Sequence, residues 1–175
     1  MGDDGYVTFS WVRPADPRVL EGRPLLDLGV GDGQTLRTLI ERRGLVVGAD
    51  RSADALRAAR HAEVPLVRSE AAALPFRDGS FATVLAGDLF HHLDEQDLEV
   101  VLHEARRVLA LGGRLIAWWY ATPGRPSPDA PRFPRSAAEV GRVASSAGYE
   151  PTRLELITEL VQGPPTEGLE LRPTG

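Results

Sequence analysis

The chain has 175 residues, of which 42% are hydrophobic, and this length fits a single domain with a core of its own. It contains no cysteine, which excludes disulfides, thiolate metal sites and cysteine nucleophiles. Its net charge of −5, without a basic run, argues against a nucleic-acid partner. No signal peptide is expected at the N-terminus, and no apolar run approaches the roughly 20 residues that span a bilayer. We therefore expect a cytoplasmic protein with no membrane association.

Strand and helix patterns alternate along the first two thirds of the chain, which predicts an α/β fold with a mostly parallel sheet. Short apolar runs predict strands at 25–28, 45–49, 64–67, 81–87 and 114–120. Apolar residues at helical spacing predict helices at 35–43, 53–61 and 93–109, with Ser52 capping the second. The pair Arg106 and Arg107 is expected to lie on a solvated helix face.

The remaining segments are assigned from their breakers and aromatic residues. A proline-rich loop is predicted over 121–135, followed by a helix at 135–147 that Gly148 closes. Strands are predicted at 149–160 and 168–172, joined by a turn through Gly163. The N-terminal aromatic residues, which are Tyr6, Phe9 and Trp11, either form a lid over a ligand or cover an open face of the sheet.

The most informative segment is the glycine loop that follows the first predicted strand. Gly29, Gly31 and Gly33 allow a sharp turn and a close approach of the backbone to a ligand. The helix that follows offers free N–H groups to an anionic group. A dinucleotide fingerprint would need a glycine at position 34, where the chain has Gln34. Asp27, two residues before the first glycine, suits a cationic amine better than a pyrophosphate.

A second acidic residue, Asp50, ends the second predicted strand. Ligands of open α/β sheets bind at the carboxyl ends of the strands, where the strand order reverses. A carboxylate at that place can accept hydrogen bonds from both hydroxyls of a ribose. The sequence therefore predicts a nucleoside site between the glycine loop and Asp50.

Several further motifs follow in order. Together with the glycine loop, the segments Val46–Ser52, Glu70–Phe81, Phe90–Leu93 and Glu104–Leu115 resemble the motifs of class I S-adenosylmethionine-dependent methyltransferases. The resemblance is to the subgroup of ubiquinone- and menaquinone-biosynthesis-like enzymes, methyltransferase type 11, and it covers roughly residues 24–120.

The resemblance implies the fold and the division of the chain. It implies a Rossmann-like three-layer sandwich with a mostly parallel seven-stranded sheet in the order 3-2-1-4-5-7-6, whose seventh strand is antiparallel. It also implies one methyltransferase domain over residues 1–175. In that division, residues 1–23 form an N-terminal segment or lid, 24–120 the cofactor-binding core, and 121–175 a loop, a last helix and a C-terminal hairpin.

The resemblance further implies that the cofactor is S-adenosyl-L-methionine and the product S-adenosyl-L-homocysteine. Asp27 and Gly29 would hold the methionine end, Asp50 the ribose, and Glu70 with Ala71 the edge of the adenine. The whole expected cofactor site consists of Asp27, Gly29, Val30, Gly31, Gly33, Asp50, Arg51, Glu70, Ala71 and Gly87. Arg51 departs from the family, which often has an apolar residue there, and Asp88 stands where small or apolar residues are more common.

Three polar residues after the fourth predicted strand are candidates for work on the acceptor. His92, Asp88 or His91 would act as a general base. For His91 the alternative is a structural hydrogen-bonding role at the start of a helix, and His92 or Asp88 could instead be exposed. The sequence has two other histidines, His61 and His103, both on predicted helices, so no metal is expected. At least one of Trp118 and Trp119 is expected in the core, and the other is a candidate to line the acceptor pocket.

The implied activity is direct transfer of the sulfonium methyl group to a small-molecule acceptor, with alignment of the two reactants as the protein's main contribution. Two rival functions stay open: a non-catalytic module of this fold that binds the cofactor and acts as a partner or regulator, and a nicotinamide-dependent oxidoreductase. The sequence also leaves a homodimer open.

Overall fold

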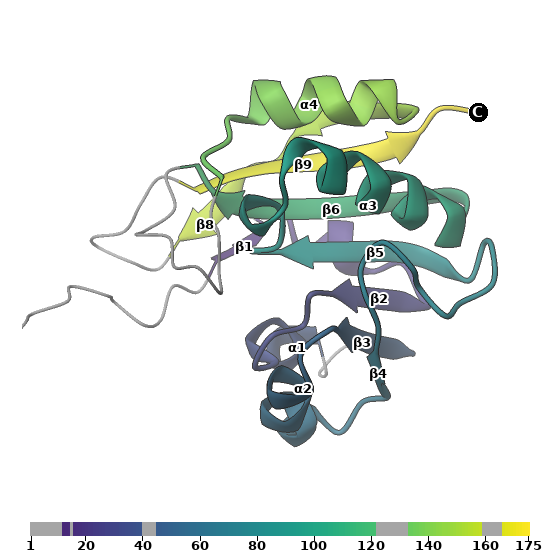
Figure 1. The fold of residues 1–175 in the computed structure, drawn as a ribbon, viewed down its shortest axis with the longest axis vertical. Coiled ribbons are helices and arrows are strands. Elements are labelled where there is room, and N and C mark those ends of the chain that lie inside the picture. Colours follow the sequence, from purple (N-terminus) through teal and green to yellow (C-terminus); the bar gives the residue numbers. More distant parts are fainter. Residues whose placement is uncertain (1–11, 15, 40–44, 122–132, 159–165) are drawn as a thin grey trace, which may run out of the picture.

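The computed structural model describes residues 12–14, 16–39, 45–121, 133–158 and 166–175. Its main sheet has seven strands in the order β4-β3-β2-β5-β6-β9-β7 (Figure 1). All pairs are parallel except those of β9, which runs antiparallel to β6 and β7. The strands are β2 (Leu25–Leu28), β3 (Val46–Asp50), β4 (Leu66–Arg68), β5 (Phe81–Gly87), β6 (Leu109–Tyr120), β7 (Tyr149–Arg153) and β9 (Thr166–Pro173). This arrangement confirms the predicted strand order and the antiparallel seventh strand.

Helices follow several strands of the sheet, and side chains cap the first turn of three of them. Ser52, Asp94 and Ser136 each accept a hydrogen bond from a backbone N–H in the first turn of a helix, and such caps satisfy donors that would otherwise lack a partner. The α-helices are α1 (Gln34–Leu39), α2 (Ala53–Ala59), α3 (Glu95–Val108) and α4 (Ala137–Ser146), and the 3-10 helices are η1 (Pro17–Leu20), η2 (Arg60–Ala62) and η3 (Phe90–His92).

None of the helices in the described part of the chain is both long enough and apolar enough to cross a membrane.

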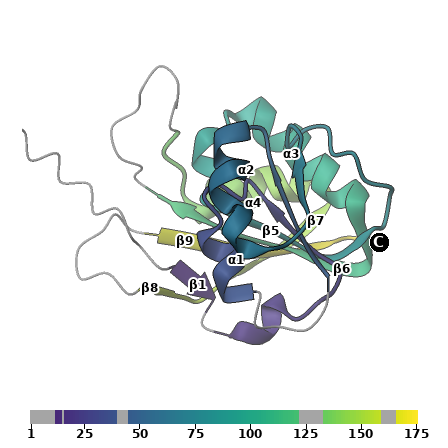
Figure 2. The ribbon, with the colours of Figure 1, turned by 90° about the horizontal axis from the view of Figure 1, so that it is seen from below.

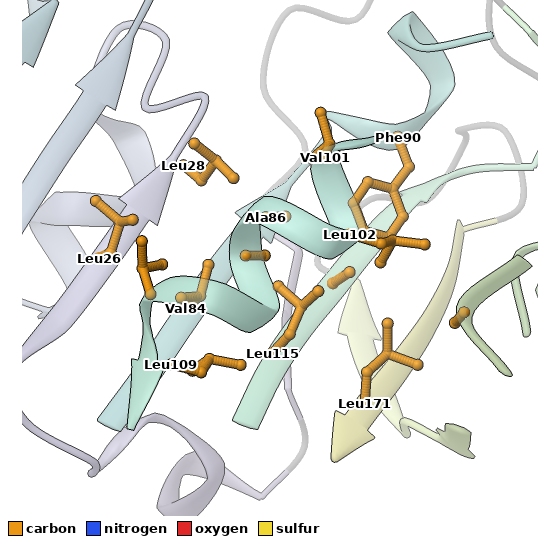
Figure 3. Packing of buried hydrophobic residues seen from close by; sticks show 14 of the residues in the cluster. Leu26, Leu28, Val84, Ala86, Phe90, Val101, Leu102, Leu109, Leu115 and Leu171 are labelled. Carbon is orange, nitrogen blue, oxygen red and sulfur yellow. The ribbon is translucent and has the colours of Figure 1, made fainter. Parts of the chain in front are cut away.

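Two hydrophobic cores lie on opposite faces of the sheet, because neighbouring strand residues point to opposite faces. Leu26 and Leu28 belong to the larger core, which α3 and α4 cover (Figure 3). Leu25 belongs to the smaller core, which includes residues of α1 and α2. The helices thus form layers on both faces, as the three-layer prediction requires.

The predicted strand at 149–160 is confirmed over Tyr149–Arg153, which forms β7, but it does not continue in the main sheet to Thr158. Leu154 and Leu156 turn onto the smaller core, where both are half-buried. The next strand, β8 (Leu156–Thr158), pairs with β1 (Val12–Pro14) in a separate two-stranded sheet. Figures 1 and 2 place this small sheet beside the first residues of β9. The N-terminal aromatic residues, the turn through Gly163 and most of the proline-rich loop lie outside the described residues.

Strand β6 begins five residues before the predicted start. Leu109 already pairs with Phe81, and the register then shifts before Arg114 pairs with Thr83. Gly112, with φ of 74°, lies within the extra length. A pair of glycines therefore marks an irregularity inside this strand, although the sequence alone favours a break before it.

Candidate active site

The loop after β2 is tied to the end of the neighbouring strand β3. The N–H groups of Gly29 and Val30 both donate to the carbonyl oxygen of Ala49, at 2.8 and 3.1 Å. Gly31 has φ of 55°, in the left-handed region that favours glycine. Among the described residues, a Cβ added to Gly31 would meet only the carbonyl oxygen of Gly29, at 4.0 Å, so no described side chain fills the space beside Gly31. Its backbone is therefore accessible to a ligand.

The other two glycines of the loop serve packing. A Cβ on Gly29 would lie 3.2 Å from the Leu89 side chain, and one on Gly33 would lie 3.1 Å from Ala59. Both residues also have positive φ, at 76° and 83°. The predicted loop is thus present, but Gly31 is the glycine whose missing side chain leaves open space.

Asp50 lies at the end of β3, and its carboxylate bonds to the backbone of the glycine loop and of Ser52. Its Oδ2 accepts a hydrogen bond from the Gly31 N–H at 3.0 Å, and its Oδ1 accepts one from the Ser52 N–H at 2.8 Å. Each oxygen of a carboxylate has two lone-pair sites, so each retains one after this bond. The carboxylate can therefore accept two hydroxyl donors while it stays fixed by the backbone.

Asp27 lies on β2, opposite Gly48 of β3, and is only 2% exposed. Its Oδ2 finds no hydrogen-bond partner among the described residues. Burial, and secondarily the charge of Asp50, raises the pKa of the Asp27 carboxyl to about 7. A buried acid that lacks a partner is suited to a cationic group of a ligand, such as an amine. Asp27, the open backbone of Gly31 and the acceptor sites of Asp50 therefore fit the amine, the main-chain contacts and the ribose of S-adenosylmethionine.

The segment after β4 begins next to Asp50, because the Ser69 N–H donates to the Asp50 carbonyl oxygen at 3.1 Å. Glu70 starts a turn in which the Ala73 N–H donates to the Glu70 carbonyl oxygen at 3.1 Å. The Glu70 side chain is exposed, whereas Ala71 is half-buried against the larger core. The Oγ of Ser69 is buried and finds no described partner. Sequence reasoning missed Ser69, although its place directly before Glu70 and after a strand was a usable signal.

Arg51, the departure from the family pattern, has an exposed side chain. Its carbonyl oxygen accepts a hydrogen bond from Arg68 Nε at 3.0 Å, which joins the ends of β3 and β4. Its predicted contact with the adenine stays a prediction.

Arg107 corrects the expectation that its helix face is merely solvated. Its guanidinium donates to both carboxylate oxygens of Glu104, each at 2.8 Å, and to Asp78 Oδ1 at 2.7 Å. It also donates to the carbonyl oxygens of Leu74 and Phe76, at 3.1 and 2.8 Å. These bonds raise the pKa of Arg107 above its usual range, with the Glu104 bond as the largest cause. They fix the segment between β4 and β5 onto α3.

The neighbouring Arg106 also has a partner, since its Nη2 donates to the carbonyl oxygen of Thr174 at 2.5 Å.

Gly87 ends β5 under the ring of Trp118. A Cβ on Gly87 would lie 2.8 Å from that ring, so the glycine is required by packing. Trp118 belongs to the smaller core and Trp119 to the larger one, and both are buried. The expectation that one of them is available to an acceptor is therefore wrong. Tyr120, the next residue, is half-buried.

Asp88 and the two histidines follow at the carboxyl end of β5. Asp88 has φ of 55°, and its N–H donates to the Trp118 carbonyl oxygen at 2.8 Å. His91 is 1% exposed, and its ring centroid lies 4.3 Å from that of His92 and 5.7 Å from that of Tyr120. His92 is half-buried. The burial of His91 favours the structural alternative for that residue, and His92 is the more accessible of the two.

Among the described residues, no group of three or more histidine, aspartate or glutamate side chains is arranged to hold a metal ion.

The structure brings Asp27, the glycine loop and Asp50 together at adjoining strand ends, and it joins the segment of Glu70 to Asp50. Asp88, His91 and His92 form a second group at the end of β5, near Tyr120 of β6. The carboxyl ends of these parallel strands lie on one side of the molecule, on the left in Figure 1. The arrangement matches a cofactor site with an acceptor side next to it.

Comparison with known proteins agrees with this arrangement. Residues 26–117 match the model of the methyltransferase domain family. A demethylmenaquinone methyltransferase of Corynebacterium kroppenstedtii is 36% identical over 122 residues, which are 68% of this chain and 52% of that protein. The chain spans about half the length of this and other such relatives from Corynebacterium and Thermus.

Solved structures share the fold. A protein of Pyrococcus horikoshii superposes with a TM-score of 0.70 at 23% identity, over 86% of this chain and 81% of that one. The structure of DhpI in complex with SAH superposes with a TM-score of 0.70 at 20% identity, over 86% and 76% of the two chains. On the match over residues 26–117, the chain belongs to the methyltransferase domain family, the S-adenosylmethionine-dependent methyltransferases.

Proposed function

We propose that this chain binds S-adenosylmethionine and transfers its methyl group to a small-molecule acceptor. The observation that carries the proposal is the buried Asp27 carboxyl, whose Oδ2 has no described partner and which lies one strand away from Asp50. Asp27 would take the amine of the cofactor, Asp50 the ribose hydroxyls, and the open backbone at Gly31 the main-chain contacts. Glu70, Ala71, Arg51 and the buried Oγ of Ser69 are the candidates for the adenine end.

The cofactor supplies a sulfonium methyl group as the electrophile. In the transfer, the bond from sulfur to the methyl carbon breaks as a bond from that carbon to the acceptor forms, and the acceptor loses a proton. The protein's part is to align the acceptor with the methyl group and to exclude water, which in general can lower a barrier by ~7–11 kcal/mol. His92 is the candidate to take the proton, with Asp88 beside it and His91 as a buried support.

The acceptor is proposed to be an aromatic quinone-type molecule. Curated relatives of this chain include demethylmenaquinone methyltransferases of Corynebacterium and Thermus. A demethylated naphthoquinone in its reduced form is therefore the first acceptor to test. Such an acceptor is a carbon nucleophile activated by its own hydroxyl groups, so a single weak base suffices for the proton.

The wider expectations stay predictions. They are the single domain over 1–175 with its core at 24–120, a cytoplasmic location, a homodimer, and the absence of a nucleic-acid partner.

The function is tested in two steps with the purified chain. Calorimetry with S-adenosylmethionine and with S-adenosylhomocysteine measures cofactor binding, with NADH as the comparison ligand. Incubation with reduced demethylmenaquinone and methyl-labelled cofactor, followed by mass spectrometry, measures transfer. We expect binding of both sulfur compounds and label in the quinone. Tight binding without transfer to any acceptor of a panel would instead identify a non-catalytic module, and binding of NADH alone would identify an oxidoreductase.

A further inference from the structure

The segment 133–135 crosses the acceptor side of the molecule just before α4 begins. Its backbone bonds two other segments that are distant in sequence. The Phe133 N–H donates to the His91 carbonyl oxygen at 2.8 Å, and the Arg135 N–H donates to the Ala121 carbonyl oxygen at 3.2 Å. The indole N–H of Trp119 in turn donates to the Arg135 carbonyl oxygen at 3.1 Å. The segment therefore joins η3 to the end of β6.

The side chain of Arg135 adds a fourth bond, and it reaches the far end of η3. Its Nη2 donates to the carbonyl oxygen of Leu93 at 2.6 Å, across 42 positions of the sequence. Leu93 caps η3 and turns the chain into extended backbone before α3. The guanidinium carbon also lies 5.9 Å from the ring centroid of Phe133, so the side chain is held over that ring. A charged donor on a carbonyl oxygen is among the stronger hydrogen bonds of proteins.

The 3-10 turn itself has few bonds of its own. The His92 N–H donates to the Leu89 carbonyl oxygen at 2.9 Å, and the Leu93 N–H donates to the Phe90 carbonyl oxygen at 3.3 Å. A 3-10 helix of three residues is weakly determined by such bonds, so its conformation depends on what holds its ends. Here the carbonyl oxygens of His91 and Leu93 are both held by segment 133–135. His92 lies between them, so the hydrogen bonds from segment 133–135 to His91 and Leu93 hold its backbone in place.

We propose that Arg135 is a positioning residue for methyl transfer: by holding the carbonyl oxygen of Leu93, it fixes the turn that carries His92 against the end of β6. The inference rests on the proposed function, because it assigns the consequence to the acceptor half of the reaction. It assigns no contact between Arg135 and the substrate. The cofactor end, around Asp27 and Asp50, has backbone hydrogen bonds of its own. Substitution of Arg135 should therefore leave cofactor binding there unchanged.

The test compares Arg135→Gln and Arg135→Lys with Arg142→Gln in the full chain. Arg142 is exposed on α4, the helix that follows segment 133–135, so its variant controls for the loss of a positive charge nearby. The first readout is hydrogen exchange at the His92 and Leu93 amides, without any ligand. Loss of one bond from a charged donor should speed exchange at these amides about tenfold in Arg135→Gln. Lysine keeps a donor, so Arg135→Lys should restore part of the protection.

The second readout separates the two ends of the site. In Arg135→Gln the affinity for S-adenosylhomocysteine should stay within about twofold of the parent, whereas kcat for the reduced demethylmenaquinone should fall about tenfold. Unchanged exchange at His92 and Leu93 would overturn the inference. So would an equal loss of S-adenosylhomocysteine affinity, since it would mean general damage to the fold. If exchange responds as expected but the parent chain transfers no methyl group, the role of Arg135 in holding the turn at His92 and Leu93 is confirmed, whereas the proposed function fails.

Discussion

The cofactor end and the acceptor end of this site are held in different ways. At the cofactor end, the site residues come from β2, the loop after it and the neighbouring strand β3, and backbone groups of Gly29, Val30 and Gly31 bond directly to the end of β3. At the acceptor end, η3, the end of β6 and the segment before α4 come from three separate parts of the chain and are joined by longer-range bonds. The cofactor end is thus built from segments close in sequence, and the acceptor end from segments distant in sequence.

The difference indicates which end can change without loss of the fold. A short strand–loop–helix unit keeps its geometry because few residues determine it. An assembled surface changes with any of its three contributing segments. Cofactor use should therefore be the robust property of this chain, and acceptor choice the property that substitutions alter most easily. The following substitutions test that contrast, from the largest expected effect to the smallest.

The pH dependence of stability tests the cofactor end through Asp27. The pKa of Asp27 is about 7 in the fold against an ordinary value of 3.8. Below pH 3.8 the group is protonated in both the folded and the unfolded chain, so its ionisation does not change the free energy of unfolding. As the pH rises toward 7, only the unfolded chain ionises, so stability falls, and above 7 the loss is complete. For about three pKa units, the loss is on the order of 4 kcal/mol.

Urea unfolding of the ligand-free chain at a series of pH values measures this loss. Asp27→Asn removes the titrating group and should flatten the decline between pH 4 and 7. Asp32→Asn, in the same loop but exposed, is the matched control and should leave the decline in place. An identical pH profile for Asp27→Asn and the parent chain would contradict the assignment.

Asp50→Ala tests the ribose contact. It removes an acceptor that is proposed to take two hydroxyl donors, and it also frees the N–H groups of Gly31 and Ser52. Affinity for S-adenosylhomocysteine should fall about 100-fold, as expected for two hydrogen bonds to a charged group at ~1.5 kcal/mol each. Calorimetry measures the change, and Asp54→Ala, an exposed acid in the next helix, provides the comparison. Unaltered affinity would place the ribose elsewhere.

Gly87→Ala tests the packing between the two ends. The added methyl group would lie 2.8 Å from the Trp118 ring. Trp118 is buried, so the ring has little room to move away. Overpacking of this kind costs ~1–3 kcal/mol, so the free energy of unfolding should fall by that amount in chemical denaturation. At Gly112 an added Cβ meets no atom of the described residues within 4 Å, but φ is 74°, so Gly112→Ala separates backbone strain from steric conflict. A larger loss at Gly112 than at Gly87 would show strain to be the greater effect.

Arg51→Ala has the smallest expected effect. The side chain is exposed, and the one bond described for the residue is accepted by its backbone carbonyl, which alanine keeps. Cofactor affinity should therefore fall less than about fivefold, the range of an exposed contact. A loss as large as that of Asp50→Ala would show that the guanidinium stacks on the adenine and that the cofactor end includes it.

The sequence predicted most of the fold because local patterns determine it. Strands β2 and β5 have the predicted bounds, and Ser52 caps α2 as expected. These elements depend on apolar runs, glycines and caps within a few residues. The order of the sheet came from the resemblance, since pairing across many residues leaves no local pattern.

The parts that the sequence did not predict depend on distant contacts. Nothing near Arg107 indicates that its guanidinium bonds to Leu74 and Phe76, more than 30 positions away. The turn of Leu154 away from the sheet depends on the smaller core, and the role of segment 133–135 depends on η3. For the site, the residue types and the strand ends were predictable, whereas the partners of Asp50 and the burial of His91 were not.

The position of β9 has a consequence for how this chain is made. β9 lies after β7 in the sequence but between β6 and β7 in the sheet. During synthesis, β7 therefore leaves the ribosome with no strand to pair with, and the edge of β6 stays open, until residues 166–173 have followed. The nascent chain can complete its cofactor end early, because β2 to β5 are then already available, but it must wait for β9 before its apolar Leu169 and Leu171 close the larger core. A stalled ribosome or a stop codon before β9 would leave an exposed sheet edge, and such a product is a candidate for aggregation and degradation.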